Sequence, residues 1–214
     1  AGNPLTRAAL ARLRPGLLLD DTLINAYSSL VASTEGARAQ VLSTFWYKRL
    51  AEGWRGYDYE AVRRWTKAVD LRQRPLALFP VNISDQHWVL ACADLVGCQV
   101  GVFDSLGGSH KEIARVVARF LDDEWRDKYG TELGAAAWPR FPRWSCPSQA
   151  NGTDCGVCVC LMVRALAEGQ APEGYFAAGD LPVLRWVIAA ELVEQRLIPG
   201  LPRPVDQEPA HGRS

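Results

Sequence analysis

The segment Pro147–Gly156 (PSQANGTDCG) leads directly into an apolar run, Val157–Ala167 (VCVCLMVRALA). The run is apolar enough to form a buried helix, and the polar turn before it, Asn151–Asp154, is a typical helix start. Cys155 therefore falls in the first turn of the predicted helix. Unpaired backbone N–H groups and the helix dipole favour a thiolate over a thiol at that position. The segment predicts a nucleophilic cysteine, although a small buried cysteine after an ordinary turn explains this stretch alone almost as well.

A β-hairpin upstream offers partners for the thiol. His87 begins an apolar stretch, Trp88–Leu95, that is typical of a strand, and Cys98–Asp104 is typical of a second strand. The short connection predicts that the two strands are antiparallel. A turn centred just after Leu95 places His87 opposite Asp104 on one face, with Cβ atoms about 4.5–5.5 Å apart. We therefore expect a carboxylate–imidazole hydrogen bond at one end of the sheet, which a one-residue slip of register would break.

Together these residues can perform acyl transfer through a cysteine. Cys155 would attack a carbonyl carbon, His87 would hold the thiol proton and later donate it to the leaving group, and Asp104 would orient the imidazole. Gln149 would donate a side-chain N–H to the developing oxyanion, beside the backbone N–H of Cys155. Taken singly, His87 is also explained as a strand-edge histidine and Asp104 as a turn-initiating aspartate. Only the combination favours a thiol enzyme.

Several motifs resemble those of the ubiquitin-like-protein-specific cysteine proteases, the SUMO proteases and deneddylases that are relatives of the adenovirus protease. In chain order they are LLLDDTLINAY (Leu17–Tyr27), VLSTFWYKRL (Val41–Leu50), VRRWTK (Val62–Lys67), DQHW (Asp85–Trp88), VFDSL (Val102–Leu106) and QANGTDCG (Gln149–Gly156). The resemblance runs from about Leu17 to Ile198, and its last motif is the most specific. It implies that His87, Asp104 and Cys155 form a catalytic triad. It also implies that Gln149 contributes to the oxyanion hole.

The same resemblance implies a narrow substrate tunnel. In the family, the tryptophan after the catalytic histidine, here Trp88, forms one wall of a tunnel that admits only an extended Gly–Gly tail. Without the resemblance, Trp88 is better explained as an aromatic strand residue packed in the core. The opposite wall is usually a tryptophan, whereas the aligned residue here is Leu18, which covers less area. Asp20 stands where the family commonly has Asn, and Asp21 matches the family. We expect Leu18, Asp20 and Asp21 to contact the substrate.

The order of the predicted elements indicates an α+β domain. Helices precede a sheet, and a buried helix follows it. The resemblance implies the papain-like, adenain-like cysteine protease fold, a central mixed sheet flanked by helices with the catalytic cysteine at the N-terminus of a buried helix. We expect an N-terminal extension over residues 1–16, a catalytic domain over 17–198 and a disordered, Pro-rich tail over 199–214. A chain of 214 residues is long enough for one domain with a real core.

Apolar spacing predicts further elements. Asp21 can cap a helix that buries one apolar face. Leu76–Ile83 predicts a strand, in which Pro80 favours a sheet edge or a bulge. Lys111–Tyr129 predicts a long helix with a charged face, and Trp138–Trp144 an irregular strand. A closing helix carries an apolar stripe of Leu184, Val187, Ile188 and Leu192.

Composition narrows the partners and the compartment. The chain has 24 Lys+Arg and 24 Asp+Glu, so its net charge favours neither nucleic acid nor an anionic membrane. No apolar run approaches the ~20 residues that span a bilayer. The six cysteines contain one CxxC, which does not make a zinc site or a disulfide framework, so a reducing compartment is expected. We expect no metal or cofactor, a monomer, and a location in the nucleus, the cytoplasm or, for a secreted effector, a host cytosol. The start at Ala1 is consistent with a fragment of a longer protein.

The leading functional hypothesis is a thiol protease or isopeptidase that cleaves after the C-terminal Gly–Gly of a ubiquitin-like modifier, SUMO foremost. It would release the modifier from lysine, mature its precursor, or do both. The alternatives are a deubiquitinase or deneddylase of the same fold, an acetyltransferase with the same Cys/His/Asp centre, and a module that grips the modifier without cleaving it. An acetyltransferase needs an acetyl-CoA site, which we do not find in the sequence. The four intact catalytic positions argue against a silent module.

Overall fold

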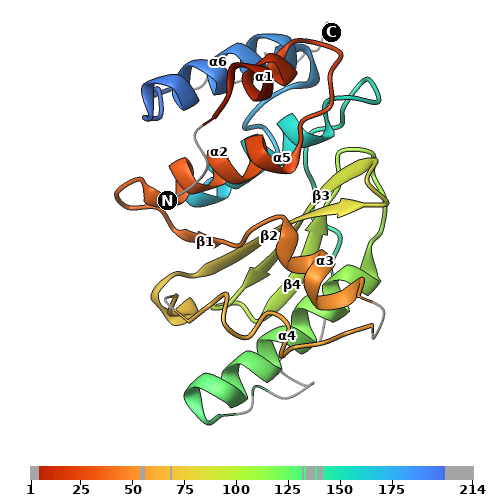
Figure 1. The fold of residues 1–214 in the computed structure, drawn as a ribbon, viewed down its shortest axis with the longest axis vertical. Coiled ribbons are helices and arrows are strands. Elements are labelled where there is room, and N and C mark those ends of the chain that lie inside the picture. Colours follow the sequence, from red (N-terminus) through yellow and green to blue (C-terminus); the bar gives the residue numbers. More distant parts are fainter. Residues whose placement is uncertain are drawn as a thin grey trace, which may run out of the picture.

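A four-stranded mixed sheet forms the centre of the molecule in the computed structural model, which describes residues 5–53, 56–67, 69–131, 133, 138 and 142–200 (Figure 1). The strands are β1 (Ala39–Val41), β2 (Leu76–Ile83), β3 (His87–Asp94) and β4 (Gln99–Phe103), in the order β1-β2-β3-β4. β1 is parallel to β2, and the other neighbours are antiparallel. This mixed sheet with its helices confirms the predicted α+β class.

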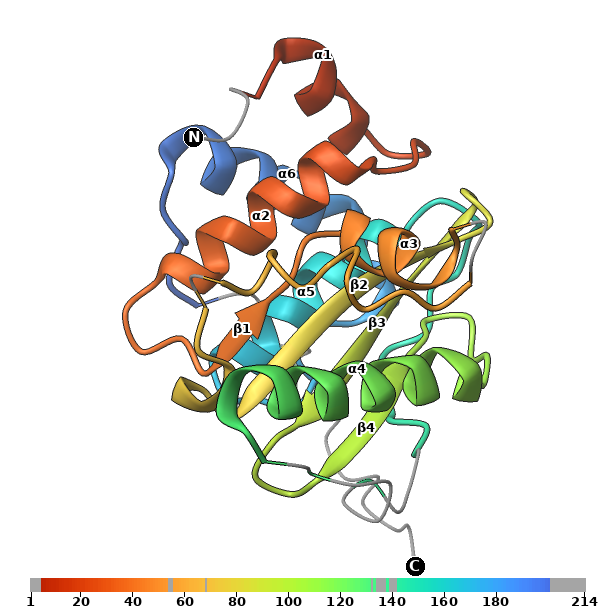
Figure 2. The ribbon, with the colours of Figure 1, turned by 60° about the horizontal axis from the view of Figure 1, so that its bottom comes forward.

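Helices cover both faces of the sheet. They are α1 (Arg7–Leu10), α2 (Asp21–Ser33), α3 (Phe45–Ala51), α4 (Lys111–Tyr129), α5 (Cys155–Ala167) and α6 (Leu181–Glu194), with short 3₁₀ turns η1 (Ala11–Leu13), η2 (Leu71–Gln73) and η4 (Ala178–Asp180). α5 and α2 lie on one face with α1 and α6 outside them, and α4 and α3 lie on the other (Figures 1 and 2). Within the described part of the chain, no helix has the length and apolar character needed to cross a membrane.

The inner strands are buried on both sides. In β3, Leu90 and Cys92 belong to the core that surrounds α5, whereas Val89 and Ala91 belong to the core beneath α3 and α4. Alternate strand residues point to opposite faces, so a strand between two helical layers needs apolar residues at every position. The continuous apolar stretch after His87 is explained by this double burial.

Helix α5 is buried along its whole length. All thirteen of its residues are buried, including Cys158 and Cys160. A helix that is apolar all round has no face to offer to solvent, so it must lie in the interior. The predicted buried helix is thus confirmed, and Cys155 is its first residue.

Two other predicted helices are present, one with a corrected cap. α4 spans Lys111–Tyr129 as expected and ends at Gly130, whose φ of 65° suits glycine at a helix C-terminus. α2 begins at Asp21, but the cap is Asp20, whose Oδ1 accepts a hydrogen bond from the N–H of Leu23 at 3.1 Å. The capping expectation for Asp21 was therefore wrong by one residue, because either aspartate satisfies the sequence pattern of a cap.

The predicted hairpin register was wrong by two residues. Leu90 pairs with Phe103, so the turn is longer than the two-residue turn that we expected. The carboxylate of Asp94 explains the difference, because its Oδ1 accepts the N–H groups of Val96 at 3.1 Å and Gly97 at 2.8 Å. A shift of two residues keeps every side chain on its expected face, whereas a shift of one would reverse them.

Pro80 lies in an inner strand, yet no residue of β1 pairs with it. β1 pairs only with Leu76–Leu78, and Pro80 pairs with Leu90 of β3 on the other side. The missing N–H of proline therefore costs no ladder hydrogen bond. Of the predicted strand over 138–144, residues 139–141 lie outside the described residues, and Arg143 forms only an isolated bridge with Val102. Most of the predicted tail, residues 201–214, also lies outside them.

Candidate active site

The four predicted catalytic residues come from the same end of the sheet. β3 begins at His87, and the antiparallel strand β4 ends one residue before Asp104. α5 begins at Cys155, whose thiol accepts a hydrogen bond from the main-chain N–H of Trp88. The cysteine therefore contacts the residue that directly follows His87.

His87 and Asp104 form the expected hydrogen bond, with 2.7 Å between Nε2 and Oδ1. They are diagonal rather than opposite neighbours, since the true register places Asp104 two residues further along. Diagonal pairs on one face remain within reach of long side chains. Because an ionised carboxylate only accepts hydrogen bonds, the proton of a neutral His87 lies on Nε2 and leaves Nδ1 free to act as a base.

Four donors surround the carboxylate of Asp104, whose side chain is 2% exposed. Oδ1 accepts from His87 and from the N–H of Leu106 at 2.9 Å, and Oδ2 accepts from the N–H of Gly108 at 2.7 Å and from Nε2 of His110 at 2.8 Å. Burial raises the pKa of Asp104, but these hydrogen bonds outweigh it and lower the pKa to about 2. Asp104 is therefore ionised at neutral pH.

The pKa of the Cys155 thiol does not follow the expectation that its position at the start of a helix favours the thiolate. The residue is 1% exposed, and this burial raises the pKa of the thiol. The main-chain N–H groups of Trp88, Gly156 and Cys155 itself act in the opposite direction without overcoming it, and the nearby carboxylate of Asp154 adds to the rise. The sulfur thus rests as a thiol, and its deprotonation needs a base.

The side chain of Gln149 is held at both ends. Its Oε1 accepts a hydrogen bond from the hydroxyl of Ser105 at 2.6 Å, and its Nε2 donates to the carbonyl of Asn151 at 2.5 Å. Its main-chain N–H also donates to the carbonyl of Ser105 at 3.0 Å. An amide has two N–H groups on Nε2, so one remains for a ligand.

Trp88 lies over the start of α5. It is buried, and its indole N–H donates to the carbonyl of Leu19 at 3.0 Å. A Cβ built on Gly156 would lie 2.8 Å from Cβ of Leu19 and 3.4 Å from the Trp88 ring, so only glycine fits beneath them. Leu18 directly precedes this contact and is 39% exposed. Trp88 therefore adjoins Cys155, and Leu18 is next in the chain to Leu19, which packs on Gly156.

The two predicted acidic contacts differ in their surroundings. Asp20 caps α2 and forms an ion pair with Arg12 at 3.1 Å, so its carboxylate is already occupied. Asp21 lines a small cleft of about 50 Å³ together with Phe45 and Asp85. Asp21 is therefore the better placed of the two to meet a partner.

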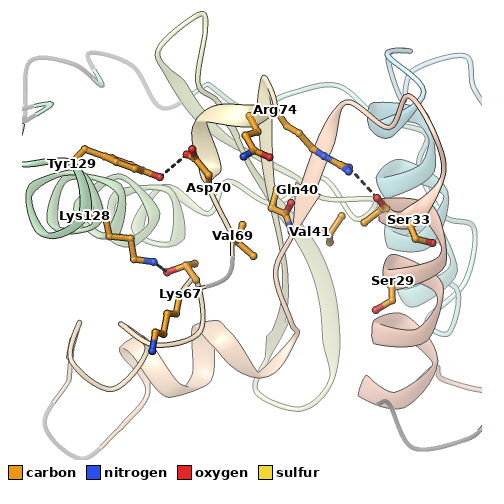
Figure 3. A pocket seen from close by; sticks show the side chains of 13 residues that line it. Ser29, Ser33, Gln40, Val41, Lys67, Val69, Asp70, Arg74, Lys128 and Tyr129 are labelled. Atoms are coloured by element: carbon orange, nitrogen blue, oxygen red, sulfur yellow. Dashed lines mark hydrogen bonds between the residues drawn. The ribbon is translucent and has the colours of Figure 1, made fainter.

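A large polar cleft of about 760 Å³ lies elsewhere on the molecule. Figure 3 shows Lys128 and Tyr129 from α4 on one side of it and Ser29 and Ser33 from α2 on the other. The hydroxyl of Tyr129 donates to Asp70 at 2.9 Å, so these groups are used to join the elements. None of its described lining residues is a histidine or cysteine, so it does not hold the catalytic groups.

Three contacts of the site were missed in the sequence. The sequence patterns gave no role in the site to His110 or to Ser105. The spacing after Asp104, where Gly108 lets the chain fold back onto the carboxylate, was the available signal. A Cβ on Gly108 would lie 2.5 Å from both Asp104 Oδ2 and His110 Nε2. The third contact, the ion pair between Asp154 and Arg185, gave no local signal. Within the described ranges, no cluster of three or more His, Cys, Asp or Glu side chains could hold a metal ion.

Comparisons with known proteins agree with this geometry. Residues 17–193 match the family described as "Ulp1 protease family, C-terminal catalytic domain". Sentrin-specific protease 2 of Rattus norvegicus is 30% identical over 91% of this chain and 33% of its own length. Ubiquitin-like-specific protease 1A of Arabidopsis thaliana is 28% identical over 89% of this chain and 39% of its own length. The chain thus spans only 33% to 39% of the length of these two relatives.

Solved structures share the fold. The C-terminal Ulp1 protease domain in complex with Smt3, the yeast ortholog of SUMO, superposes with a TM-score of 0.75 and 25% identity, over 89% of this chain and 83% of that one. A second structure, of a de-sumoylating protease, has a TM-score of 0.74 at 21% identity, over 89% of this chain and 86% of that one, and it supports the fold alone. The family match over most of the chain confirms the resemblance seen in the motifs. This chain belongs to the Ulp1 protease family and corresponds to its C-terminal catalytic domain.

Proposed function

We propose that this chain is a thiol isopeptidase that cleaves after the C-terminal Gly–Gly of SUMO, to release it from lysine, to mature its precursor, or both. The observation that carries the proposal is the 2.7 Å hydrogen bond between His87 and Asp104, set beside Cys155 by the N–H of Trp88. The relatives named above include SUMO-specific proteases, and one of the solved relatives is bound to a SUMO ortholog.

The proposed reaction starts from a thiol. Nδ1 of His87 takes the proton of Cys155 as the sulfur attacks the carbonyl carbon of the last glycine. The resulting oxyanion is stabilised by the free N–H of Gln149 and the main-chain N–H of Cys155. The imidazolium then donates its proton to the departing lysine amine, which leaves a thioester on the sulfur. His87 next activates a water that hydrolyses the thioester and restores the free thiol.

Asp104 stabilises the imidazolium that forms in each step. Its carboxylate carries a negative charge because its pKa is about 2. The hydrogen bond to Nε2 of His87 holds the ring with Nδ1 free for the sulfur. This role needs no proton transfer to the carboxylate itself.

The proposed substrate channel runs beside Trp88 and Leu18. Trp88 packs on Gly156 next to the nucleophile, and a Gly–Gly tail has no Cβ atoms to clash with such a wall. Leu18 offers an exposed apolar surface one residue before the Leu19 carbonyl that Trp88 binds. Asp21, at the cleft beside α2, is the proposed contact for the globular body of the modifier.

A trapping panel tests the proposal. SUMO, the Nedd-type modifier and ubiquitin, each with a thiol-reactive group after the last glycine, are incubated with the wild-type chain and with Cys155→Ala. The matched control is Cys98→Ala, which removes an exposed thiol away from the site. We expect a covalent adduct with SUMO that survives Cys98→Ala and is lost in Cys155→Ala.

Other outcomes of the panel separate the alternatives. An adduct formed only with ubiquitin or the Nedd-type modifier would reassign the substrate and retain the chemistry. No adduct from folded protein would contradict the isopeptidase and favour a transferase or a binding-only role.

A further inference from the structure

We propose that Ser105 is a positioning residue that fixes the orientation of the Gln149 side-chain amide. This inference rests on the proposed function, because it assigns a supporting group to the oxyanion site of that reaction. Ser105 directly follows Asp104 in the chain. Its buried hydroxyl donates to the side chain of Gln149, the proposed oxyanion donor of that reaction.

The hydrogen bonds of Gln149 define which way its amide faces. The hydroxyl of Ser105 donates to Oε1 at 2.6 Å, and one N–H of Nε2 donates to the carbonyl of Asn151 at 2.5 Å. Turning the amide over would place Nε2 against the hydroxyl and Oε1 against the carbonyl of Asn151. The second of these contacts joins two acceptors, so the observed orientation is favoured. It leaves the remaining N–H free for an oxyanion.

Ser105 also lies against helix α5. The side chain of Ser105 adjoins the thiol of Cys158 on α5. Oε1 of Gln149 can only accept, so the Ser105 proton points to it. Cys158 lies one helical turn after Cys155, so Ser105 lies between the oxyanion donor and the helix that carries the nucleophile.

The main chain strengthens this link. The N–H of Gln149 donates to the carbonyl of Ser105 at 3.0 Å, so the two residues are joined by backbone and side chain alike. Asp104 orients the imidazole and its neighbour Ser105 orients the amide, so one short segment positions both the base and the oxyanion donor. A donor held in place before the reaction needs no reorganisation as charge develops.

Loss of the hydroxyl is expected to act on kcat rather than on KM. Without Ser105 the amide has only the Asn151 carbonyl to orient it, so part of the population presents Oε1 or a tilted N–H to the oxyanion. Removal of an oxyanion donor outright costs about 10²–10³ in kcat. We expect kcat of Ser105→Ala to fall about 10-fold, a fraction of that effect, with KM unchanged, because the Gln149 N–H acts on charge that develops only in the transition state.

A double-mutant cycle tests this role. Wild type, Ser105→Ala, Gln149→Ala and the double variant are compared with a SUMO substrate that carries a fluorogenic leaving group after Gly–Gly. If Ser105 acts through Gln149, the double variant turns over at the rate of Gln149→Ala alone. Ser109→Ala, at an exposed position of the same loop, serves as the matched control and is expected to keep the wild-type rate.

A second readout separates positioning from general damage to the site. Alkylation of Cys155 by iodoacetamide, followed by mass spectrometry, needs the sulfur and His87 but forms no oxyanion. We expect Ser105→Ala to keep the wild-type alkylation rate while kcat falls. Alkylation that slows as much as kcat falls would overturn the proposal. So would a double variant whose loss of kcat equals the combined losses of the two single variants. A wild-type chain inactive on every modifier would instead refute the proposed function, on which this inference depends.

Discussion

Arg185 of α6 and Asp154, the residue before Cys155, form a buried ion pair, with Nε and Nη2 of Arg185 at 2.9 and 2.5 Å from Oδ1 of Asp154. The arginine is 1% exposed. Its remaining N–H groups donate to the main-chain carbonyls of Arg12, Arg14, Leu17 and Thr153. Asn151 binds the other oxygen of Asp154 at 2.7 Å. The turn that presents the nucleophile is therefore held by a residue 31 positions away and is joined to the N-terminal segment.

Replacement of Arg185 by alanine is expected to lower the free energy of unfolding by about 3–5 kcal/mol, because it leaves the carboxylate of Asp154 buried without a countercharge. Urea denaturation measures this change. Arg115→Ala is the control, since Arg115 pairs with Glu112 on the exposed surface of α4 and such pairs contribute about 0–1 kcal/mol. Equal effects of the two substitutions would show that the buried pair does not hold the turn.

Acid is expected to remove the stabilisation that Asp104 contributes. The pKa of Asp104 is lowered from 3.8 to about 2 in the folded chain, so the ionised form stabilises the fold by about 2 kcal/mol above pH 4. That contribution is lost as the pH falls from about 4 to 2. The unfolding free energies of wild type and Asp104→Asn are compared by urea titration across this range. Their difference should shrink with falling pH, and a constant difference would contradict the role of the four donors.

Replacement of His87 by alanine is expected to lower the turnover rate by orders of magnitude, since no other base is assigned to the Cys155 thiol. Burial raises the pKa of that thiol, so spontaneous ionisation will not compensate at neutral pH. Iodoacetamide alkylation of Cys155 in the variant should be slow at pH 7 and still increase above pH 9. Near-normal turnover, or alkylation that levels off near neutral pH, would refute the triad.

The substitution Gly108→Ala is expected to reduce kcat/KM by about 10–100-fold, because small displacements of catalytic groups have effects of this size. The new Cβ would lie 2.5 Å from Oδ2 of Asp104 and from Nε2 of His110, which forces the carboxylate to move. The matched control is Gly179→Ala, where a Cβ meets nothing within 4 Å. Steady-state kinetics should show a lower kcat/KM for Gly108→Ala than for Gly179→Ala. Similar kcat/KM values would show that the hydrogen bonds around Asp104 tolerate displacement of the carboxylate.

The substitution Leu18→Trp is expected to lower KM for a Gly–Gly substrate by about 2- to 10-fold, from the ~0.5–1.5 kcal/mol that aromatic stacking contributes. The indole ring of the new tryptophan would complete the channel wall opposite Trp88. Val96→Trp, at an exposed position of the β3–β4 turn, controls for the added apolar surface. An unchanged KM for Leu18→Trp would place the Gly–Gly tail away from this residue.

Local patterns in the sequence determined much of this protein. The helix over 111–129 and the strand over 76–83 follow from apolar spacing, and the buried helix that starts at Cys155 follows from a run with no polar face. The predicted contact between His87 and Asp104 is present, although the predicted register was wrong by two residues. The prediction of the contact was correct because alternate residues of a strand lie on the same face, so a shift of two residues leaves both side chains on that face.

Only the tertiary structure decided how the site is electrically and geometrically arranged. The pKa of the Cys155 thiol is raised rather than lowered. Trp88 and Leu19 bury the first turn of α5, and this burial outweighs the main-chain N–H groups that favour the thiolate. The hydroxyl of Ser105 on Gln149 and the guanidinium of Arg185 on Asp154 join segments 44 and 31 residues apart. Such contacts depend on packing between distant elements, and desolvation depends on everything packed around a group. A local pattern of residues contains neither.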